Sequence, residues 1–103
     1  ISNSTIVCAN RIDIHDNVFI GGSCKIWDTD FHSLDPIARK EGREIRTSPI
    51  KISKNVFIGG SSIILKGVAI GENSVIAAGS VLSKDVPSNQ VWGGNPAKYI
   101  KNL

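Results

Sequence analysis

The sequence predicts an all-β fold, a parallel β-helix, and three features of residues 52–86 support this prediction. An aliphatic residue leads each unit of six residues, a turn-forming residue stands three places after it, and a small or β-branched residue stands four places after it. The leads are Ile52, Ile58, Ile64, Ile70, Ile76 and Leu82. Short internal repeats indicate a solenoid, and a period of six residues is typical of a parallel β-helix.

Each unit is expected to form a short strand followed by a corner of a triangular prism. The lead points inward, and the residue four places later supplies a second inward column. Gly, Asn and Asp at the corners tolerate the positive φ that a sharp turn requires. Three units close one coil, so residues eighteen apart, such as Ile52 and Ile70, should stack about 4.8 Å apart. An antiparallel β-sandwich is the competing fold, but its turns are irregularly spaced, whereas this repeat does not slip.

Length and composition indicate one domain over residues 1–103. No apolar run approaches the length of a membrane span, and no signal peptide is recognisable. The net charge of +3 is mild and the basic residues are dispersed, which argues against nucleic-acid binding. Cys8 and Cys24 both fall on inward columns as small buried hydrophobes, which suits a reducing cytoplasm. The chain starts at Ile1 and contains no Met, so it is compatible with a piece of a longer protein.

Residues 1–26 carry a weaker copy of the repeat. Its leads are Ser2, Cys8, Ile14, Ile20 and Ile26, and its second inward column is Ile6, Ile12, Val18 and Cys24. The segment IHDNVFIGG (14–22) returns as ISKNVFIGG (52–60), which indicates that both segments keep one register. Because Ser2 and Cys8 are poor leads, the first coil is expected to be irregular.

Residues 28–50 break the period, and about twenty of them must leave the prism as a loop. A long loop on a regular scaffold is usually functional or disordered. This loop contains His32, with Asp28 and Asp30 just before it.

The tail, residues 87–103, is expected to close the prism, with Trp92 over the open end because solenoids need caps. Asn95-Pro96 has the form of a helix N-cap followed by Pro at the first helical position. A short C-terminal helix is therefore predicted. The residues expected to face the body from this helix are Ala97, Ile100 and Leu103.

These segments together resemble the hexapeptide-repeat O-acetyltransferases, and among them the maltose/galactoside acetyltransferase type. The resemblance rests on the repeat, the looped-out DTDFHSLDPIAR, the run NVFIGGSSIILKGVAIGENSVIAAGSVLSKDVP and the tail WGGNPAKYI, and it covers the chain from about residue 12 onward. It implies a left-handed β-helix and a homotrimer with active sites between neighbouring subunits. It also implies acetyl-CoA as co-substrate in the groove between two prisms, a sugar-like acceptor and no metal.

The resemblance implies the role of general base for His32, which matches the loop histidine of the family. A neutral imidazole can take the proton of the acceptor hydroxyl as the oxygen attacks the thioester. Gly60 matches the position whose backbone N–H stabilises the oxyanion that forms. Asp28 or Asp30 could orient the imidazole, and a role as solvated loop acids is equally compatible with the sequence. His15 is expected at a corner, on the surface.

The same resemblance implies the remaining contacts. Acetyl-CoA contacts are implied at Gly60, Ala78, Ser83, Lys84, Lys98 and Lys101, with the lysines near the phosphates of the nucleotide end. Asp30 and Phe57 are the implied acceptor contacts. The competing interpretations are a solvated basic tail for the lysines and a subunit contact for Phe57.

The acceptor stays open. The N-terminal helical segment of the maltose/galactoside enzymes is not found in this sequence, and Ile1 matches an upstream Asn that contacts the acceptor. A surface-polysaccharide sugar or its nucleotide-linked precursor is as compatible as a galactoside or maltose.

Three other classes share parts of this pattern. Zinc-dependent carbonic anhydrases use this prism but bind metal through three histidines, and the chain has only His15 and His32. Ice-binding prisms need a ladder of Thr, which occurs here only at positions 5, 29 and 47. A non-catalytic trimeric scaffold that has lost acceptor binding is the main alternative.

Overall fold

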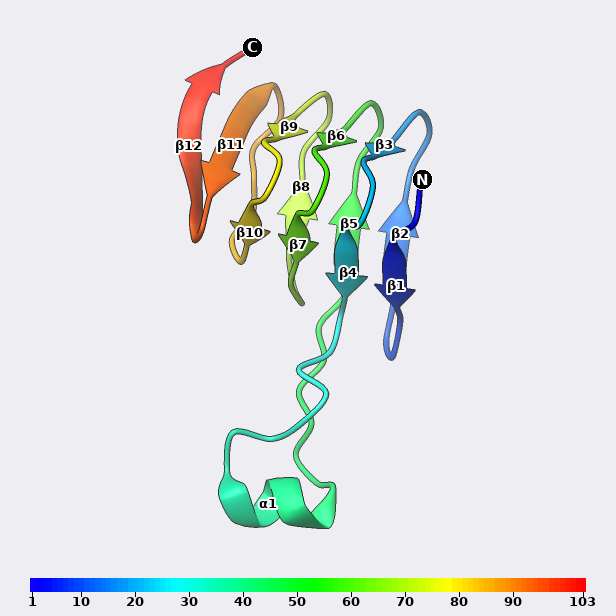
Figure 1. Cartoon of the computed structure of the whole chain (residues 1–103), viewed down its shortest axis with the longest axis vertical. Helices are drawn as coiled ribbons and strands as arrows, with labels where there is room; N and C mark the ends of the chain where they lie inside the picture. Colours follow the sequence, from blue (N-terminus) through cyan, green and yellow to red (C-terminus); the bar gives the residue numbers. More distant parts are fainter.

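The computed structural model describes residues 1–103 and consists of a prism of short strands with one long projecting loop (Figure 1). The first sheet contains β1 (Thr5–Val7), β4 (Lys25–Trp27), β7 (Ile63–Ile64) and β10 (Val81–Leu82). The second contains β2 (Ile12–Ile14), β5 (Ile50–Ile52) and β8 (Ala69–Ile70). The third contains β3 (Phe19–Ile20), β6 (Phe57–Ile58), β9 (Val75–Ile76), β11 (Gln90–Gly94) and β12 (Ala97–Asn102). The strands of successive coils pair in parallel, which confirms the predicted left-handed parallel β-helix.

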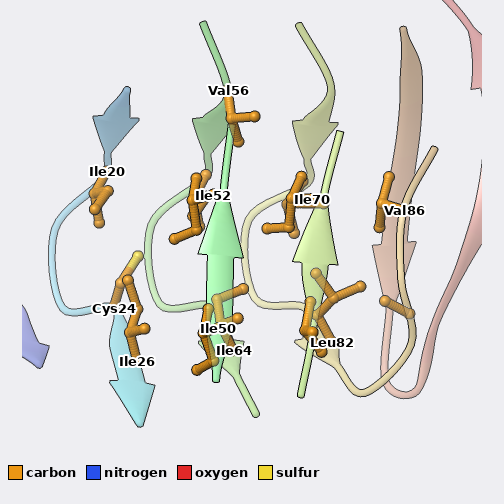
Figure 2. Close-up of a cluster of buried hydrophobic side chains, with 14 residues drawn as sticks. Ile20, Cys24, Ile26, Ile50, Ile52, Val56, Ile64, Ile70, Leu82 and Val86 are labelled. Carbon is orange, nitrogen blue, oxygen red and sulfur yellow. The ribbon is translucent and has the colours of Figure 1, made fainter. Parts of the chain in front are cut away.

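The predicted leads from Ile20 onward form the core of the prism, whereas the earlier lead Ile14 is exposed (Figure 2). Each of the six leads of residues 52–86 is at most 1% exposed. The eighteen-residue stacking is also confirmed, because Ile52 pairs with Ile70 and Ile58 with Ile76. The second inward column is buried as well, and its Ser hydroxyls donate to backbone carbonyls, as Ser62 does to Ala77 at 3.2 Å. Each buried aliphatic side chain stabilises the fold by about 1.5–3 kcal/mol, so the stacked leads supply most of the driving force.

The first coil departs from the predicted register. Cys8 was expected inside but is exposed, and Ile6 instead pairs with Ile26 of the next coil. The reason is that the corner between β1 and β2 is longer than the repeat. Ile6 aligns with Ile26, and Ile14 aligns with Ile52. Ile6 and Ile14 therefore occupy the positions of successive leads, but they are eight residues apart rather than six (14 − 6 = 8). Cys24 is buried as predicted.

The loop leaves the prism after β4 and returns at β5, so it comprises residues 28–49. Ile50 is the last residue of the predicted loop, but it is fully buried in β5. The loop points away from the strands and contains helix α1 (Pro36–Glu41), which was not predicted (Figure 1). Asp35 caps the start of α1 and Gly42, with φ of 70°, caps its end. No helix in the structure has the length and apolarity that crossing a membrane would require.

The predicted C-terminal helix is wrong. Residues 90–102 form the hairpin β11–β12, in which β11 extends the third sheet beside β9 and β12 returns antiparallel. The backbone groups of the tail are therefore satisfied by a sheet that already exists, and this tertiary context overrides the local helix signal. Ala97 is buried as expected, but Ile100 is 54% and Leu103 63% exposed. Trp92 packs against the core, as predicted for the cap.

Candidate active site

His32 lines an open hollow within the projecting loop. The hollow has a volume of about 580 Å³, and its lining residues are Asp30, His32, Ser33, Leu34, Asp35, Glu44, Ile45 and Arg46. The imidazole of His32 is exposed and makes no hydrogen bond within the chain. A neutral imidazole in this position is free to accept a proton from a molecule in the hollow.

The backbone around His32 is held in a fixed conformation. The N–H of His32 donates to the carbonyl of Asp30 at 2.7 Å, and the N–H of Phe31 donates to Oγ1 of Thr29 at 3.0 Å. Phe31 has φ of 64°, which is uncommon for a bulky side chain. Its ring also packs edge-to-face on Trp27 with centroids 5.3 Å apart. Such conformations persist where surrounding contacts enforce them, often at functional sites.

Asp28 has a structural task in this chain. Its buried carboxylate accepts hydrogen bonds from the backbone N–H groups of Ala9, Asn10 and Arg11, each at 2.7 Å. Burial raises the pKa of Asp28, but these three hydrogen bonds and a contact from Cys8 lower it, and the net pKa lies below the ordinary value of 3.8. The carboxylate therefore stays ionised and holds the enlarged first corner.

Asp30 lies beside His32 in the hollow, but its carboxylate is paired elsewhere. Oδ1 of Asp30 lies 3.3 Å from Nζ of Lys66, a residue of the next coil that was not among the predicted site residues. Neither Asp28 nor Asp30 is hydrogen-bonded to the imidazole of His32 in this chain. Lys66 stands two places after the lead Ile64, but its position in the repeat gives no signal of this ion pair, which depends on how the loop folds.

Gly60 and Ala78 lie together at another corner, where the chain passes from the third sheet to the first. We call this the glycine corner, and it comprises residues 21–22, 59–60 and 77–78. The carbonyl of Gly60 accepts the N–H of Gly79 at 2.9 Å, while the N–H of Gly60 donates to nothing within the chain. Phe57 lies just before this corner on the outer face of β6 and is 49% exposed. The corner thus combines a backbone N–H that has no partner within the chain with the outward ring of Phe57.

The other predicted acetyl-CoA contacts lie in two further places. Ser83 and Lys84 are exposed at the corner after β10, and the long loop leaves from the same corner of the prism two coils earlier, after β4. Lys98 and Lys101 are exposed on β12, opposite Gly93 and Val91. No ion pair engages any of these three lysines.

A single chain does not bring all these residues together. His32 and Asp30 lie on the loop that follows the first sheet, whereas Gly60 and Ala78 lie at the corner that precedes it. The width of one sheet separates the two corners. The candidate residues of one chain therefore form two partial sites, one at each end of the strands of the first sheet.

Comparison with known proteins identifies relatives for nearly the whole chain. Residues 49–84 match the family model described as the hexapeptide repeat of succinyl-transferase. Galactoside O-acetyltransferase of Escherichia coli strain K12 is 42% identical over 101 residues, which are 98% of this chain and 49% of that protein. The chain spans about half the length of the curated relatives it matches.

Solved structures match in fold as well as in sequence. A hexapeptide-repeat acetyltransferase of Vibrio cholerae in complex with acetyl-CoA has a TM-score of 0.90 and 40% identity, covering 98% of this chain and 54% of that chain. A second structure of the same protein has a TM-score of 0.78 and 31% identity, with 99% of this chain and 72% of that chain covered. A maltose O-acetyltransferase of Clostridium difficile 630 has a TM-score of 0.83 and 38% identity, with 98% and 59% covered. On this coverage and identity, the chain belongs to the hexapeptide-repeat acetyltransferase family and is similar to its galactoside and maltose O-acetyltransferase members.

Proposed function

We propose that the chain transfers acetyl from acetyl-CoA to a hydroxyl of a sugar or sugar-containing acceptor, with His32 as general base. One observation carries the proposal: the exposed imidazole of His32 lies in a hollow of the loop and has no partner within the chain. The 42% identity to a galactoside O-acetyltransferase supports the reaction class.

His32 would take the proton of the acceptor hydroxyl while that oxygen forms a bond to the thioester carbonyl carbon. An alcohol is a weak nucleophile at neutral pH, and a positioned base typically accelerates such a step by about 10²–10⁴-fold. The carbonyl oxygen then carries negative charge, which the free N–H of Gly60 can stabilise. When the tetrahedral intermediate collapses, the C–S bond breaks, the proton on His32 passes to the sulfur, and CoA leaves as a thiol.

The proposed site lies between copies of the chain, as a homotrimer would provide. Two observations support this arrangement. The outer face of the third sheet is apolar, with Phe19 on β3 paired to Phe57 on β6 and Val75 on β9. The projecting loop also leaves apolar side chains uncovered, among them Leu34, which is 84% exposed. A neighbouring copy that covers these surfaces would bring its glycine corner towards His32, uniting the two partial sites.

The acetyl-CoA contacts would divide by chemistry. Gly60, Ala78 and Ser83 offer little side chain, so the pantetheine arm could lie against backbone. Lys84, Lys98 and Lys101 are exposed and unpaired, so their ammonium groups could meet the phosphates of CoA. Asp30 and Phe57 are the proposed acceptor contacts.

We propose a cytoplasmic location on the basis of the two free thiols, Cys8 and Cys24.

The decisive experiment is acetyl-CoA consumption with a panel of sugars and nucleotide sugars, followed by mass spectrometry of the acceptors. We expect one class of acceptor to gain a single acetyl group with the wild type and not with His32→Ala. No turnover by the wild type and no CoA binding would favour the non-catalytic scaffold. Zinc bound to the purified protein, detected by a metal assay, would instead favour the carbonic-anhydrase-like class.

A further inference from the structure

We propose that Lys66 is a positioning residue for the reaction, because its ion pair with Asp30 fixes the part of the loop that carries His32. This inference rests on the proposed function of His32. Lys66 belongs to the prism rather than to the loop. It follows β7, which pairs with β4, so it lies at the corner of the next coil beside the point where the loop leaves. It is therefore a link between the rigid scaffold and the proposed base.

The base of the loop is a narrow antiparallel ribbon. Ser48 donates its N–H to the carbonyl of Asp28 at 3.0 Å, and Asp30 donates its N–H to the carbonyl of Arg46 at 3.0 Å. Between these bonds Thr29 and Thr47 form a bridge. The ribbon thus has an outgoing strand, residues 28–30, and a returning strand, residues 46–48.

Two consecutive residues of the next coil hold the two strands of this ribbon in different ways. Gly67 donates its N–H to the carbonyl of Ser48 at 3.1 Å, which is a backbone anchor for the returning strand. Lys66 reaches Asp30 at 3.3 Å, which is a side-chain anchor for the outgoing strand. Removing the side chain of Lys66 would release the outgoing strand from this coil and leave the returning strand attached.

The anchored residue is coupled directly to His32. The carbonyl of Asp30 accepts the N–H of His32 at 2.7 Å, and the one residue between them is Phe31 with its left-handed backbone. A shift of Asp30 is therefore passed on to His32 with little room for compensation. Displacement of a reacting group by about 1 Å can lower a rate by about 10²-fold, even when the change lies away from the chemistry.

The same pair should contribute little to stability. The side chains of Lys66 and Asp30 are 31% and 33% exposed, and ion pairs that water reaches add little to the free energy of folding. A purely structural role would lower the melting temperature and the rate together. A positioning role predicts a lower kcat with an unchanged melting temperature.

The test compares Lys66→Met, Lys66→Arg and Lys54→Met in the full chain. Lys54 is the matched control, because it pairs with Glu72 at 3.9 Å on another corner and is more exposed. We expect Lys66→Met to lower kcat by about 10-fold or more while the KM for acetyl-CoA and the melting temperature stay at the wild-type values. Lys66→Arg should restore most of kcat, and Lys54→Met should behave as the wild type. A wild-type kcat in Lys66→Met, or an equal loss in Lys54→Met, would overturn the proposal.

Hydrogen exchange separates this inference from the proposed function. The amide of His32 should exchange faster in Lys66→Met than in Lys54→Met, whether or not the acceptor is known. If the His32 amide exchanges faster in Lys66→Met but the wild type acetylates no acceptor, the proposed function is refuted while the role of Lys66 in fixing the loop is supported. Unchanged exchange in Lys66→Met would refute the anchor even in an active enzyme.

Discussion

Gly59 approaches Ala78 of the next coil so closely that a Cβ on Gly59 would lie 2.5 Å from the backbone nitrogen of Ala78. The same contact recurs one coil earlier, where a Cβ on Gly21 would lie 2.5 Å from the nitrogen of Gly60. Both contacts are with backbone, which cannot rotate away as a side chain can. The glycine corner is therefore packed backbone to backbone, and this packing sets the spacing of the coils beside the proposed oxyanion donor.

Gly59→Ala should destabilise the fold by about 1–3 kcal/mol, because the added methyl group must push two coils apart. Thermal or urea unfolding measures the loss. Gly79→Asn is the control at a neighbouring corner position. Gly79 has φ of 74°, which Asn tolerates, and nothing lies within 4 Å of the position that a Cβ would take there. Equal stability of the two variants would mean that the corner is not packed as described.

The ionised carboxylate of Asp28 should make the free energy of unfolding depend on pH in the acidic range. Its pKa is lower in the folded chain than its ordinary value of 3.8, so the folded state binds its proton less readily than the unfolded state. The stabilisation is therefore fully present above the unfolded pKa, and it is lost as the pH falls from about 4 through the folded pKa. Urea unfolding at a series of pH values between about 2 and 7 should show this loss.

Asp28→Asn is the matching variant, because the amide has nearly the same shape but no charge. It should cost about 1.5–3 kcal/mol at neutral pH, since three backbone N–H groups lose a charged acceptor. It should also flatten the acid-dependent part of the curve. An acid dependence equal to that of the wild type would assign the effect to other carboxyl groups.

The prism could be predicted from the sequence because each inward position is tied to a fixed step along the chain. The repeat alone predicts that Ile64 and Leu82 lie on the axis, without information about their contacts. The first corner could not be predicted in this way. Its two extra residues wrap around the carboxylate of Asp28, which lies about twenty residues further along the chain. Contacts of that kind do not recur at a fixed spacing along the chain, so the repeat does not predict them.

The same local signal stands before α1, which was not predicted from it, and before the tail, which was wrongly predicted to be a helix. Asp35-Pro36 begins α1, and Gly42 ends it, so both ends of that helix carry their expected residues. Asn95-Pro96 has the same start but no Gly after a helical stretch, and it lies in the turn between β11 and β12. A free sheet edge at β9 decided the outcome, and the edge exists only once the prism has formed. The candidate base could be found from its loop, but Lys66 could not, because its ion pair depends on how the loop folds.

Ile70→Asp should prevent folding, because it buries a charge on the axis of the prism without a partner. Ile100→Asp places the same residue on the exposed face of β12 and should leave the circular dichroism spectrum and the melting temperature near those of the wild type. A soluble Ile70→Asp variant with a normal melting temperature would show that the register of the axis is wrong.

His32→Ala should lower kcat by about 10²–10⁴-fold, because it removes the group that takes the hydroxyl proton. The dissociation constant for CoA should hardly change, since the proposed CoA contacts lie on the prism and its C-terminal hairpin. His15→Ala is the control: His15 is the only other histidine, and it is exposed at the corner after β2. If both variants lost the same activity, a general effect of histidine removal would explain the result. If His32→Ala alone lost CoA binding together with activity, His32 would be a contact for the co-substrate rather than the base.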